Sequence, residues 1–244
     1  MQMPSAYDGA FARVYDRLVG NGSHRAQWVK AAIETTIPGA RSLLELGCGT
    51  GSVLDALDQG TDFALAGLDL SRDMLRSARS RLSRTVALHQ MNMVHFRLAG
   101  RFDAIIAVFD TVNHLVDLDD WPRLFAAVSK HLSTGGVFLL DLLEPNWIAT
   151  AAEGSPYIFR VENDVVIQEI AMDGPSLVDT RMDIFEAATN GLHYERSSVE
   201  IRERTLPRSE VIRLLGQHFK RVEDYPESQP GHFALIASGL LSGE

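Results

Sequence analysis

Glycine recurs at alternate positions directly after a short apolar run, in the segment Leu43-Leu44-Glu45-Leu46-Gly47-Cys48-Gly49-Thr50-Gly51. Glycine adopts positive φ without strain and lets a ligand approach the backbone closely. The apolar run is typical of a strand buried on both faces of a parallel sheet, and helical spacing begins after it, over 52–57. The segment therefore predicts a strand, a glycine turn and a helix, with a small-molecule site at the turn.

An acid, Asp69, ends the next apolar run, 22 positions after Gly47. A carboxylate at about this distance from a glycine turn is typical of contact with ribose hydroxyls, whose protons it accepts. The other interpretation of Asp69 is a cap for the following helix, but Ser71 fits that role better. We therefore expect Asp69 to hold the ribose of a nucleoside-containing cofactor.

The stretch from Glu45 to Gly51 resembles the E/D-x-G-x-G-x-G signature of class I S-adenosylmethionine-dependent methyltransferases. The alternatives are an ordinary glycine turn and a dinucleotide-binding enzyme, whose third glycine comes one residue later and whose helix N-terminus binds pyrophosphate. The resemblance implies that S-adenosyl-L-methionine is the cofactor and that Glu45 serves its amino end. The residues expected to contact this cofactor are Tyr15, Arg25, Glu45, Gly47, Cys48, Gly49, Gly51, Asp69, Leu70, Met74, Met91, Asn92, Met93 and Val108.

The segment Met91-Asn92-Met93 follows a third predicted strand, over 86–90. It resembles the third motif of the same family, in which an acid often bonds the amino group of adenine. Here the matching position is Asn92, whose amide oxygen can accept the same hydrogen bond without charge. Met91 and Met93 either pack on the faces of adenine or fill the core.

Residues 11–18, Phe-Ala-Arg-Val-Tyr-Asp-Arg-Leu, have helical spacing. They resemble the Y-D-x-L opening of many small-molecule methyltransferases, where this helix covers the cofactor. The resemblance places Tyr15 beside the methionine end of the cofactor, and the alternative is a core aromatic residue on an amphipathic helix. Tyr7 and Arg25 are further candidates for the same lid.

The stretch Asp110-Thr111-Val112-Asn113-His114-Leu115 follows the fourth predicted strand, over 102–109. Ligands of open α/β sheets bind beyond the carboxyl ends of the strands, so we expect this tip to face the transferable methyl group. Histidine has an ordinary pKa of about 6.5 and suits acid–base work. The stretch is similar to the S-S-x-G-H-L of sugar amine N-methyltransferases, where the histidine faces the substrate.

This similarity predicts that Asp110, Asn113 and His114 bind substrate, and that Asp110, His114 and Tyr15 serve catalysis. Two structural alternatives stay open: His114 bonded to backbone at a helix start, and Asp110 as a cap of the next helix. His193 and His232 could also reach a substrate lid, but nothing in their spacing requires it.

Apolar runs alternate with helical segments in the order expected for an α/β fold. We expect a Rossmann-like, seven-stranded, mostly parallel sheet with helices on both faces and an antiparallel β insertion after the fifth strand, 137–142. Further strands are expected over 42–46 and 63–69, and helices over 6–28 with a break at 20–22, 27–36, 72–84, 118–132 and 209–217. The expected division is 1–40 as an N-terminal helical lid, 41–145 as the cofactor-binding core, 146–206 as the insertion, and 207–244 as a C-terminal helix and β-hairpin completing the core.

The insertion is predicted from short alternating stretches rich in β-branched residues, from Tyr157 to Arg204. Turn signals fall at Asp173-Gly174-Pro175 and Asn190-Gly191, which predicts three or four antiparallel strands. Such an insertion serves as a substrate lid or as a contact in a homodimer. Dispersed acids such as Glu162 and Asp164 indicate a solvated face.

Composition excludes several classes of protein. The 244 residues carry a net charge of −9 without a stripe of lysine or arginine, which disfavours DNA or RNA as a partner. The single cysteine, Cys48, excludes an internal disulfide and a multi-cysteine metal site, and no histidine or carboxylate spacing indicates a metal. No apolar run reaches the roughly 18 residues of a membrane span, and a signal-peptide pattern is lacking, so we expect a cytoplasmic protein.

We therefore expect an enzyme that transfers a methyl group from S-adenosylmethionine to N or O of a small-molecule acceptor by in-line displacement, with His114 as base or orienter. One alternative is a methyltransferase of a peptide N-terminus or of tRNA, although a tRNA enzyme should show a basic face. Others are an aminopropyl-transferring enzyme on the same fold and a non-catalytic protein that only binds adenosylmethionine.

Overall fold

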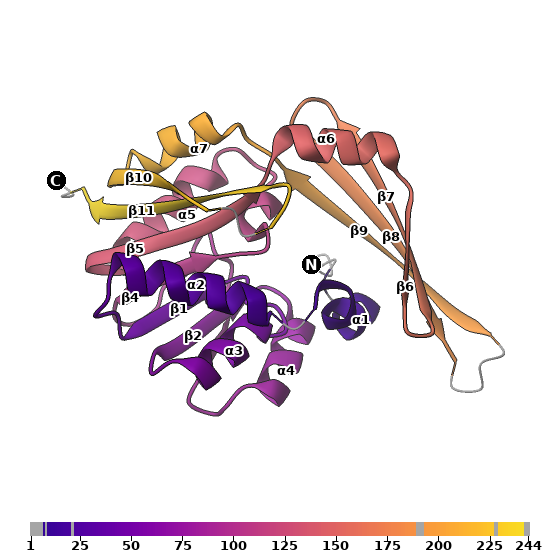
Figure 1. Ribbon diagram of the computed structural model, residues 1–244, viewed down its shortest axis with the longest axis horizontal. Coiled ribbons are helices and arrows are strands. Elements are labelled where there is room, and N and C mark those ends of the chain that lie inside the picture. The colour runs from indigo at the N-terminus through magenta and orange to yellow at the C-terminus, as the bar shows by residue number, and fades with distance from the viewer. Residues whose placement is uncertain (1–6, 8, 21, 189–192, 227–228, 242–244) are drawn as a thin grey trace.

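A seven-stranded sheet forms the centre of the computed structural model, which describes residues 7, 9–20, 22–188, 193–226 and 229–241 (Figure 1). Its strand order is β10-β11-β5-β4-β1-β2-β3, and every pairing is parallel except those of β11 with β5 and β10. The predicted α/β class is therefore confirmed. The strands are β1 (Ser42–Leu46), β2 (Ala64–Asp69), β3 (Ala87–Gln90), β4 (Phe102–Ala107), β5 (Leu132–Leu143), β10 (Phe219–Tyr225) and β11 (His232–Leu240).

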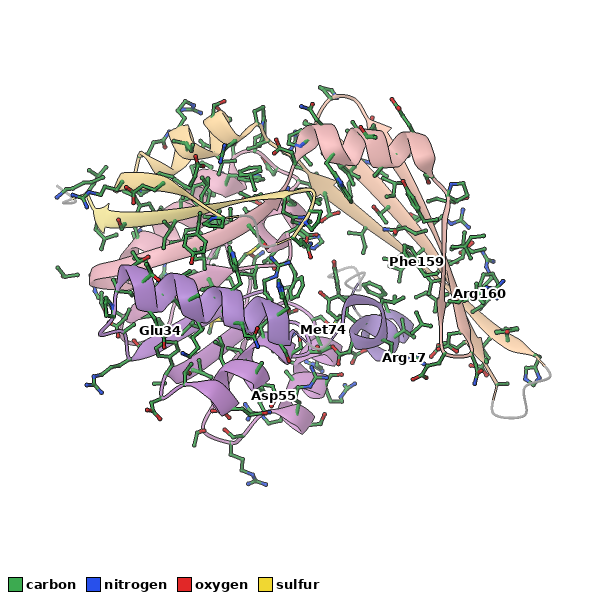
Figure 2. The ribbon with its side chains drawn as sticks, viewed as in Figure 1. Arg17, Glu34, Asp55, Met74, Phe159 and Arg160 are labelled. Carbon is green, nitrogen blue, oxygen red and sulfur yellow. The ribbon has the colours of Figure 1, made fainter. Side chains whose placement is uncertain are left out.

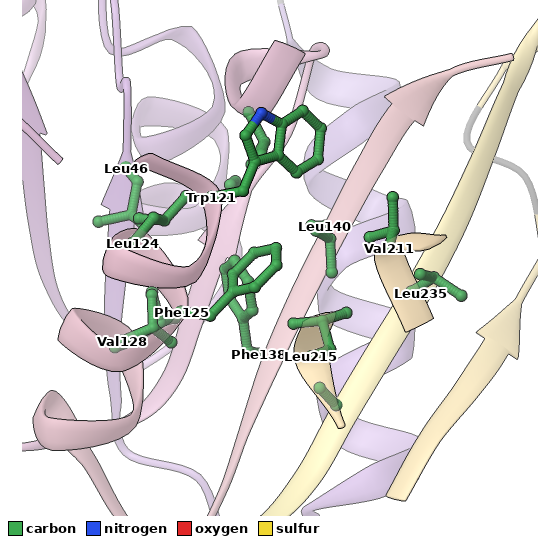
Figure 3. Packing of buried hydrophobic residues seen from close by; sticks show 14 of the residues in the cluster. Leu46, Trp121, Leu124, Phe125, Val128, Phe138, Leu140, Val211, Leu215 and Leu235 are labelled. Atoms are coloured by element: carbon green, nitrogen blue, oxygen red, sulfur yellow. The ribbon is translucent and has the colours of Figure 1, made fainter. Parts of the chain in front are cut away.

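Helices bury both faces of this sheet. On one face, α5 (Asp120–His131) and α7 (Arg208–Leu215) cover a cluster that includes Trp121, Phe125 and Phe138 (Figure 3). The other face is covered by α2 (Ser23–Thr36), α3 (Ser52–Gly60) and α4 (Arg72–Arg81). Burial on two faces explains why the central strands are continuous apolar runs. Among the described residues, no helix has the length and apolar character needed to cross a membrane.

A second, antiparallel sheet of four strands follows β5, as the sequence predicted. Its order is β6-β7-β8-β9, and Gly174, at φ 73°, lies in the predicted turn between β7 and β8. The other predicted turn, Asn190-Gly191, lies outside the described residues. A helix that the sequence analysis missed, α6, begins at Pro145, which suits a first helical position. The elements are α6 (Pro145–Gly154), β6 (Tyr157–Val161), β7 (Asp164–Asp173), β8 (Leu177–Ala187) and β9 (Tyr194–Arg204).

The first helix, α1 (Ala10–Val19), lies between the core and the second sheet (Figure 1). Phe11 and Val14 pack against the second sheet, in a cluster with Val166, Ile184 and Ile201. The apolar face of α1 is therefore buried by the insertion, and the helix closes the space between the two sheets.

Several element boundaries differ from the prediction by a few residues, most clearly that of β5. Helix α2 begins at Ser23, directly after the predicted break at 20–22, where Gly22 lies in the left-handed region at φ 68°. Strand β5 begins at Leu132 rather than at Val137, because Leu132 already pairs with Phe102 across a register shift.

Candidate active site

The glycine turn after β1 is shaped by positive φ angles of 65° at Gly47 and 52° at Gly49. A Cβ atom on Gly47 would lie 2.5 Å from Cγ2 of Thr111, so only glycine fits there. A Cβ on Gly49 would meet nothing within 4 Å, and this residue lines a cavity. The turn thus offers bare backbone to a ligand, as the sequence predicted.

Asp69 lies at the end of β2, beside this turn. Its carboxylate accepts hydrogen bonds from the backbone N–H of Gly49, at 2.9 Å, and of Ser71, at 2.8 Å. Ser71 in turn caps α4 by accepting from the N–H of Met74 at 3.1 Å. Asp69 is therefore not the helix cap, and two backbone amides hold its carboxylate at the cavity wall.

The first cavity has a volume of about 560 Å³, within the range of small-molecule sites. It contains the buried carboxyl of Glu45, which is 3% exposed and whose Oε2 has no hydrogen-bond partner among the described residues. Burial first, and Asp69 second, raise the pKa of Glu45 well above its ordinary value. The predicted cofactor residues that line this cavity are Tyr15, Glu45, Gly47, Cys48, Gly49, Asp69, Leu70, Met74, Met91, Asn92 and Met93.

Three residues expected at the cofactor do not line this cavity. Gly51 faces α4, where an added Cβ would lie 2.8 Å from Leu82, so its glycine serves helix packing. Val108 is buried in the core between the sheet and its helices. Arg25 is buried in an ion pair with Asp141, their side chains being 3% and 0% exposed, and it does not line this cavity.

The Arg25–Asp141 pair supports the turn that follows β4. Asp141 accepts a hydrogen bond from the backbone N–H of Asp110 at 3.2 Å, and the guanidinium of Arg25 lies 4.3 Å from the ring centroid of Phe109. Phe109 and Asp110 both have positive φ, 57° and 50°, which costs about 1–3 kcal/mol for each non-glycine residue. The ion pair thus holds a strained turn that presents the side chain of Asp110.

Asp110 lines a second cavity, of about 390 Å³, between α1 and the second sheet. Residues of the second sheet, among them Gln168, Thr180 and Met182, form its outer wall. Four residues line both cavities, namely Tyr7, Tyr15, Phe109 and Ile201. The two cavities therefore adjoin, and Tyr15 stands in the wall they share.

His114, in the 3₁₀ turn Thr111–His114, lies at this junction. Its Nε2 is 2.9 Å from the hydroxyl of Tyr7, and its Nδ1 is 3.7 Å from Oε1 of Glu203. Burial lowers the pKa of His114, which keeps the imidazole neutral near pH 7. A neutral imidazole between a phenol and a carboxyl can donate with one nitrogen and accept with the other.

Glu203 lines the second cavity, although it was not predicted as a site residue. This residue is 7% exposed, and its Oε1 has no hydrogen-bond partner among the described residues. Burial first, and Asp110 second, raise the pKa of Glu203 well above its ordinary value. A signal was present, because Glu203 follows Val199 and Ile201 at alternate positions of β9, where a strand places its inward side chains.

Asn113 was expected at the substrate, and the structure corrects this. It is 0% exposed, its Nδ2 donates to the carbonyl of Arg204 at 2.8 Å, and its Oδ1 accepts from the N–H of Leu143 at 3.1 Å. The amide therefore ties the 3₁₀ turn to β9 and β5, and it does not line either cavity.

Helix α1 is fastened over the glycine turn through Asp16, the acid of the Y-D stretch. Its carboxylate accepts hydrogen bonds from the hydroxyl of Thr50 and from the guanidinium of Arg81. Tyr15, the neighbour of Asp16, is held in the wall between the cavities as a result.

His232, whose spacing in the sequence did not indicate a role, pairs with Asp110 at 3.3 Å between Nε2 and Oδ1. Burial alone would raise the pKa of Asp110, but its hydrogen bond with His232 and the charge of His232 outweigh burial and lower it. Burial alone would lower the pKa of His232, but the same carboxylate raises it. Within the described ranges, no three His, Cys, Asp or Glu side chains are grouped to hold a metal ion.

This pair predicts a pH-dependent stability. Because the pKa of Asp110 is lowered in the folded protein, Asp110 contributes stability above about pH 3.9, and this contribution is lost on acidification. Because the pKa of His232 is raised, His232 contributes stability below about pH 6.5, and this contribution is lost as the pH rises through its raised pKa. We therefore expect His232→Gln to cost about 1–2 kcal/mol at pH 5 and clearly less at pH 9. Urea unfolding of both proteins at the two pH values measures this, and an equal cost at both would contradict the pairing.

Comparison with known proteins agrees with this geometry. Residues 43–136 match a family described as a methyltransferase domain. The chain is 36% identical over 154 residues to the dTDP-3-amino-3,4,6-trideoxy-alpha-D-glucopyranose N,N-dimethyltransferase of Streptomyces venezuelae, which covers 61% of this chain and 62% of that protein. It is 29% identical over 231 residues to YqeM of Bacillus subtilis (strain 168), covering 92% of each. The solved structure of Streptomyces venezuelae DesVI superposes with a TM-score of 0.79 at 26% identity, covering 95% of this chain and 99% of that chain.

The fold and the glycine turn with its paired acid define the class I methyltransferase architecture. With these matches, residues 43–136 are similar to a methyltransferase domain, and the chain has the fold of the Streptomyces venezuelae structure. The chain spans just under two thirds of the first of these relatives in sequence.

Proposed function

We propose that this chain transfers a methyl group from S-adenosylmethionine to an amine nitrogen of a small-molecule acceptor. The observation that carries the proposal is the meeting of two cavities at Tyr7, Tyr15 and Phe109, one with the glycine turn and the other with Asp110 and Glu203. An amine acceptor is also supported by the Streptomyces venezuelae relative, whose name states an N,N-dimethyltransferase of an amino sugar.

The first cavity fits the cofactor by the chemistry of its lining. Asp69 supplies carboxylate oxygens for the ribose hydroxyls, and the buried Oε2 of Glu45 can accept from the ammonium of the methionine part. Asn92 lines the same cavity, with Oδ1 accepting from the N–H of Val94 at 2.8 Å, which leaves its second lone pair for the adenine amino group.

The second cavity holds the acceptor in this proposal, with α1 as lid and the second sheet as the acceptor wall. The bound cofactor supplies an electrophilic methyl group and a thioether leaving group. The acceptor nitrogen gives its lone pair to the methyl carbon as the C–S bond pair passes to sulfur, and the methylated ammonium then releases one proton. His114, Tyr7 and Tyr15 orient the nitrogen at the junction, and such orientation can contribute roughly 7–11 kcal/mol.

Isothermal titration of the purified protein tests the proposal. We expect micromolar binding of S-adenosylmethionine and of S-adenosylhomocysteine, and no binding of NADH as the control, because Asp69 faces a turn without a pyrophosphate-binding pattern. Radioactive methyl transfer from S-adenosylmethionine to a panel of amines and matched alcohols then tests the choice of nitrogen. Absence of binding by either adenosyl compound would refute the proposed function.

A further inference from the structure

The described side chains of charged type that line the second cavity, which is the proposed acceptor cavity, are both acidic. Asp110 and Glu203 contribute carboxyl groups, and Gln168, Thr180 and Gln229 are its neutral polar side chains. Among the described side chains that line it, none is a lysine or an arginine.

Three described basic side chains around this cavity are already paired. Arg17, at the end of α1 beside the second sheet, has its Nη1 2.5 Å from the carboxylate of Asp164 (Figure 2). Arg25 is buried against Asp141, and His232 bonds Asp110. An anionic ligand would thus have to break an existing ion pair to gain a counter-charge.

The buried carboxyl of Glu203 indicates a ligand that donates hydrogen bonds. Its side chain is more than nine-tenths buried, it lines the cavity, and its Oε1 has no hydrogen-bond partner among the described residues. Buried polar atoms are nearly always paired in native structures, so one that faces a cavity indicates a partner supplied by the ligand.

The remaining lining is apolar and aromatic. Phe11, Leu18, Phe159, Val166 and Met182 surround the acids. This lining suits the carbon body of a ligand whose polar end is a single N–H donor group.

We infer that the acceptor binds as an organic ammonium with an apolar body and without phosphate, its N–H groups facing Asp110 and Glu203, and that one N–H proton passes to the neutral imidazole of His114 before the nitrogen lone pair attacks the methyl carbon. This inference rests on the proposed function and deepens it by naming the substrate class. A nucleoside diphosphate attached to the amine would set its negative charges against the carboxylate of Asp110, in a cavity whose described lining contains no lysine or arginine. The chain would then differ in acceptor from relatives whose names state dTDP-linked amino sugars.

The test uses the full chain saturated with S-adenosylhomocysteine, so that only the acceptor cavity is free. Cyclohexylammonium chloride, cyclohexanol and dTDP are titrated separately by calorimetry. We expect the ammonium to bind at least 10-fold more tightly than the alcohol of the same shape, and dTDP not to bind. Asp110→Asn removes the charge and should weaken ammonium binding about 10-fold, and Glu203→Leu removes a hydrogen-bond acceptor and should also weaken it, whereas Glu169→Gln, at an exposed position of β7, should leave it unchanged.

Several outcomes would overturn the inference. These are dTDP binding tighter than the ammonium, equal binding of ammonium and alcohol, or ammonium binding unaffected by both carboxyl substitutions. The comparison of the three ligands in the unsubstituted protein decides the matter even if a variant does not fold. Failure of S-adenosylhomocysteine to bind in the first step would instead refute the proposed function.

Discussion

Replacing Asp69 with alanine is expected to weaken binding of S-adenosylhomocysteine about 100-fold, which corresponds to about 2.7 kcal/mol. In the proposed site the carboxylate accepts from two ribose hydroxyls, and hydrogen bonds to a charged group contribute about 1.5–3 kcal/mol each. The substitution also removes the acceptor for the N–H of Gly49, at 2.9 Å, which loosens the glycine turn. Titration calorimetry of the two proteins measures the change.

Asp62→Ala is the matched control, because Asp62 is an exposed acid between α3 and β2. Asp69→Asn keeps one carbonyl oxygen, so we expect a smaller loss of affinity than with alanine. Thermal unfolding of each variant shows whether the fold is retained. An affinity of Asp69→Ala within twofold of the parent would show that the ribose assignment is wrong.

Replacing Arg25 with methionine is expected to lower the free energy of unfolding by about 3–5 kcal/mol, because it leaves the carboxylate of Asp141 buried without its counter-charge. For a chain of this size, we expect a melting temperature about 10 °C lower. The strained turn at Phe109 and Asp110 also loses the support of the guanidinium. Urea unfolding and thermal melts measure both quantities.

Arg97→Met, at an exposed position, is the matched control, and we expect a change within about 0.5 kcal/mol. The double variant Arg25→Met/Asp141→Asn removes both charges while keeping an amide oxygen for the N–H of Asp110. It should recover part of the lost stability, since the cost of an unpaired buried charge disappears. A double variant as unstable as the sum of the two single variants would contradict the ion-pair explanation.

The sequence by itself determined the core fold and most of the lining of the first cavity. The glycine turn, its preceding strand and Asp69 are local features with a fixed spacing, and parallel strands bring their carboxyl ends to one edge of the sheet. Burial on both faces left continuous apolar runs that located β1, β2 and β4. For these reasons most residues expected at the cofactor do line the first cavity.

The tertiary structure alone decided which polar groups meet at the second cavity. Glu203 and His232 come from strands far along the chain, and only the packing of the second sheet and of β11 places them beside Asp110. The same long-range packing pairs Arg25 with Asp141. It also places Asn113 where its side chain forms hydrogen bonds with the backbone of both β5 and β9. A polar side chain in a sequence shows which hydrogen bonds it can make, but its partner is set by distant backbone that local spacing does not record. The physical reason is that burial forces each polar group to find a partner, and the fold determines whether that partner is protein or ligand.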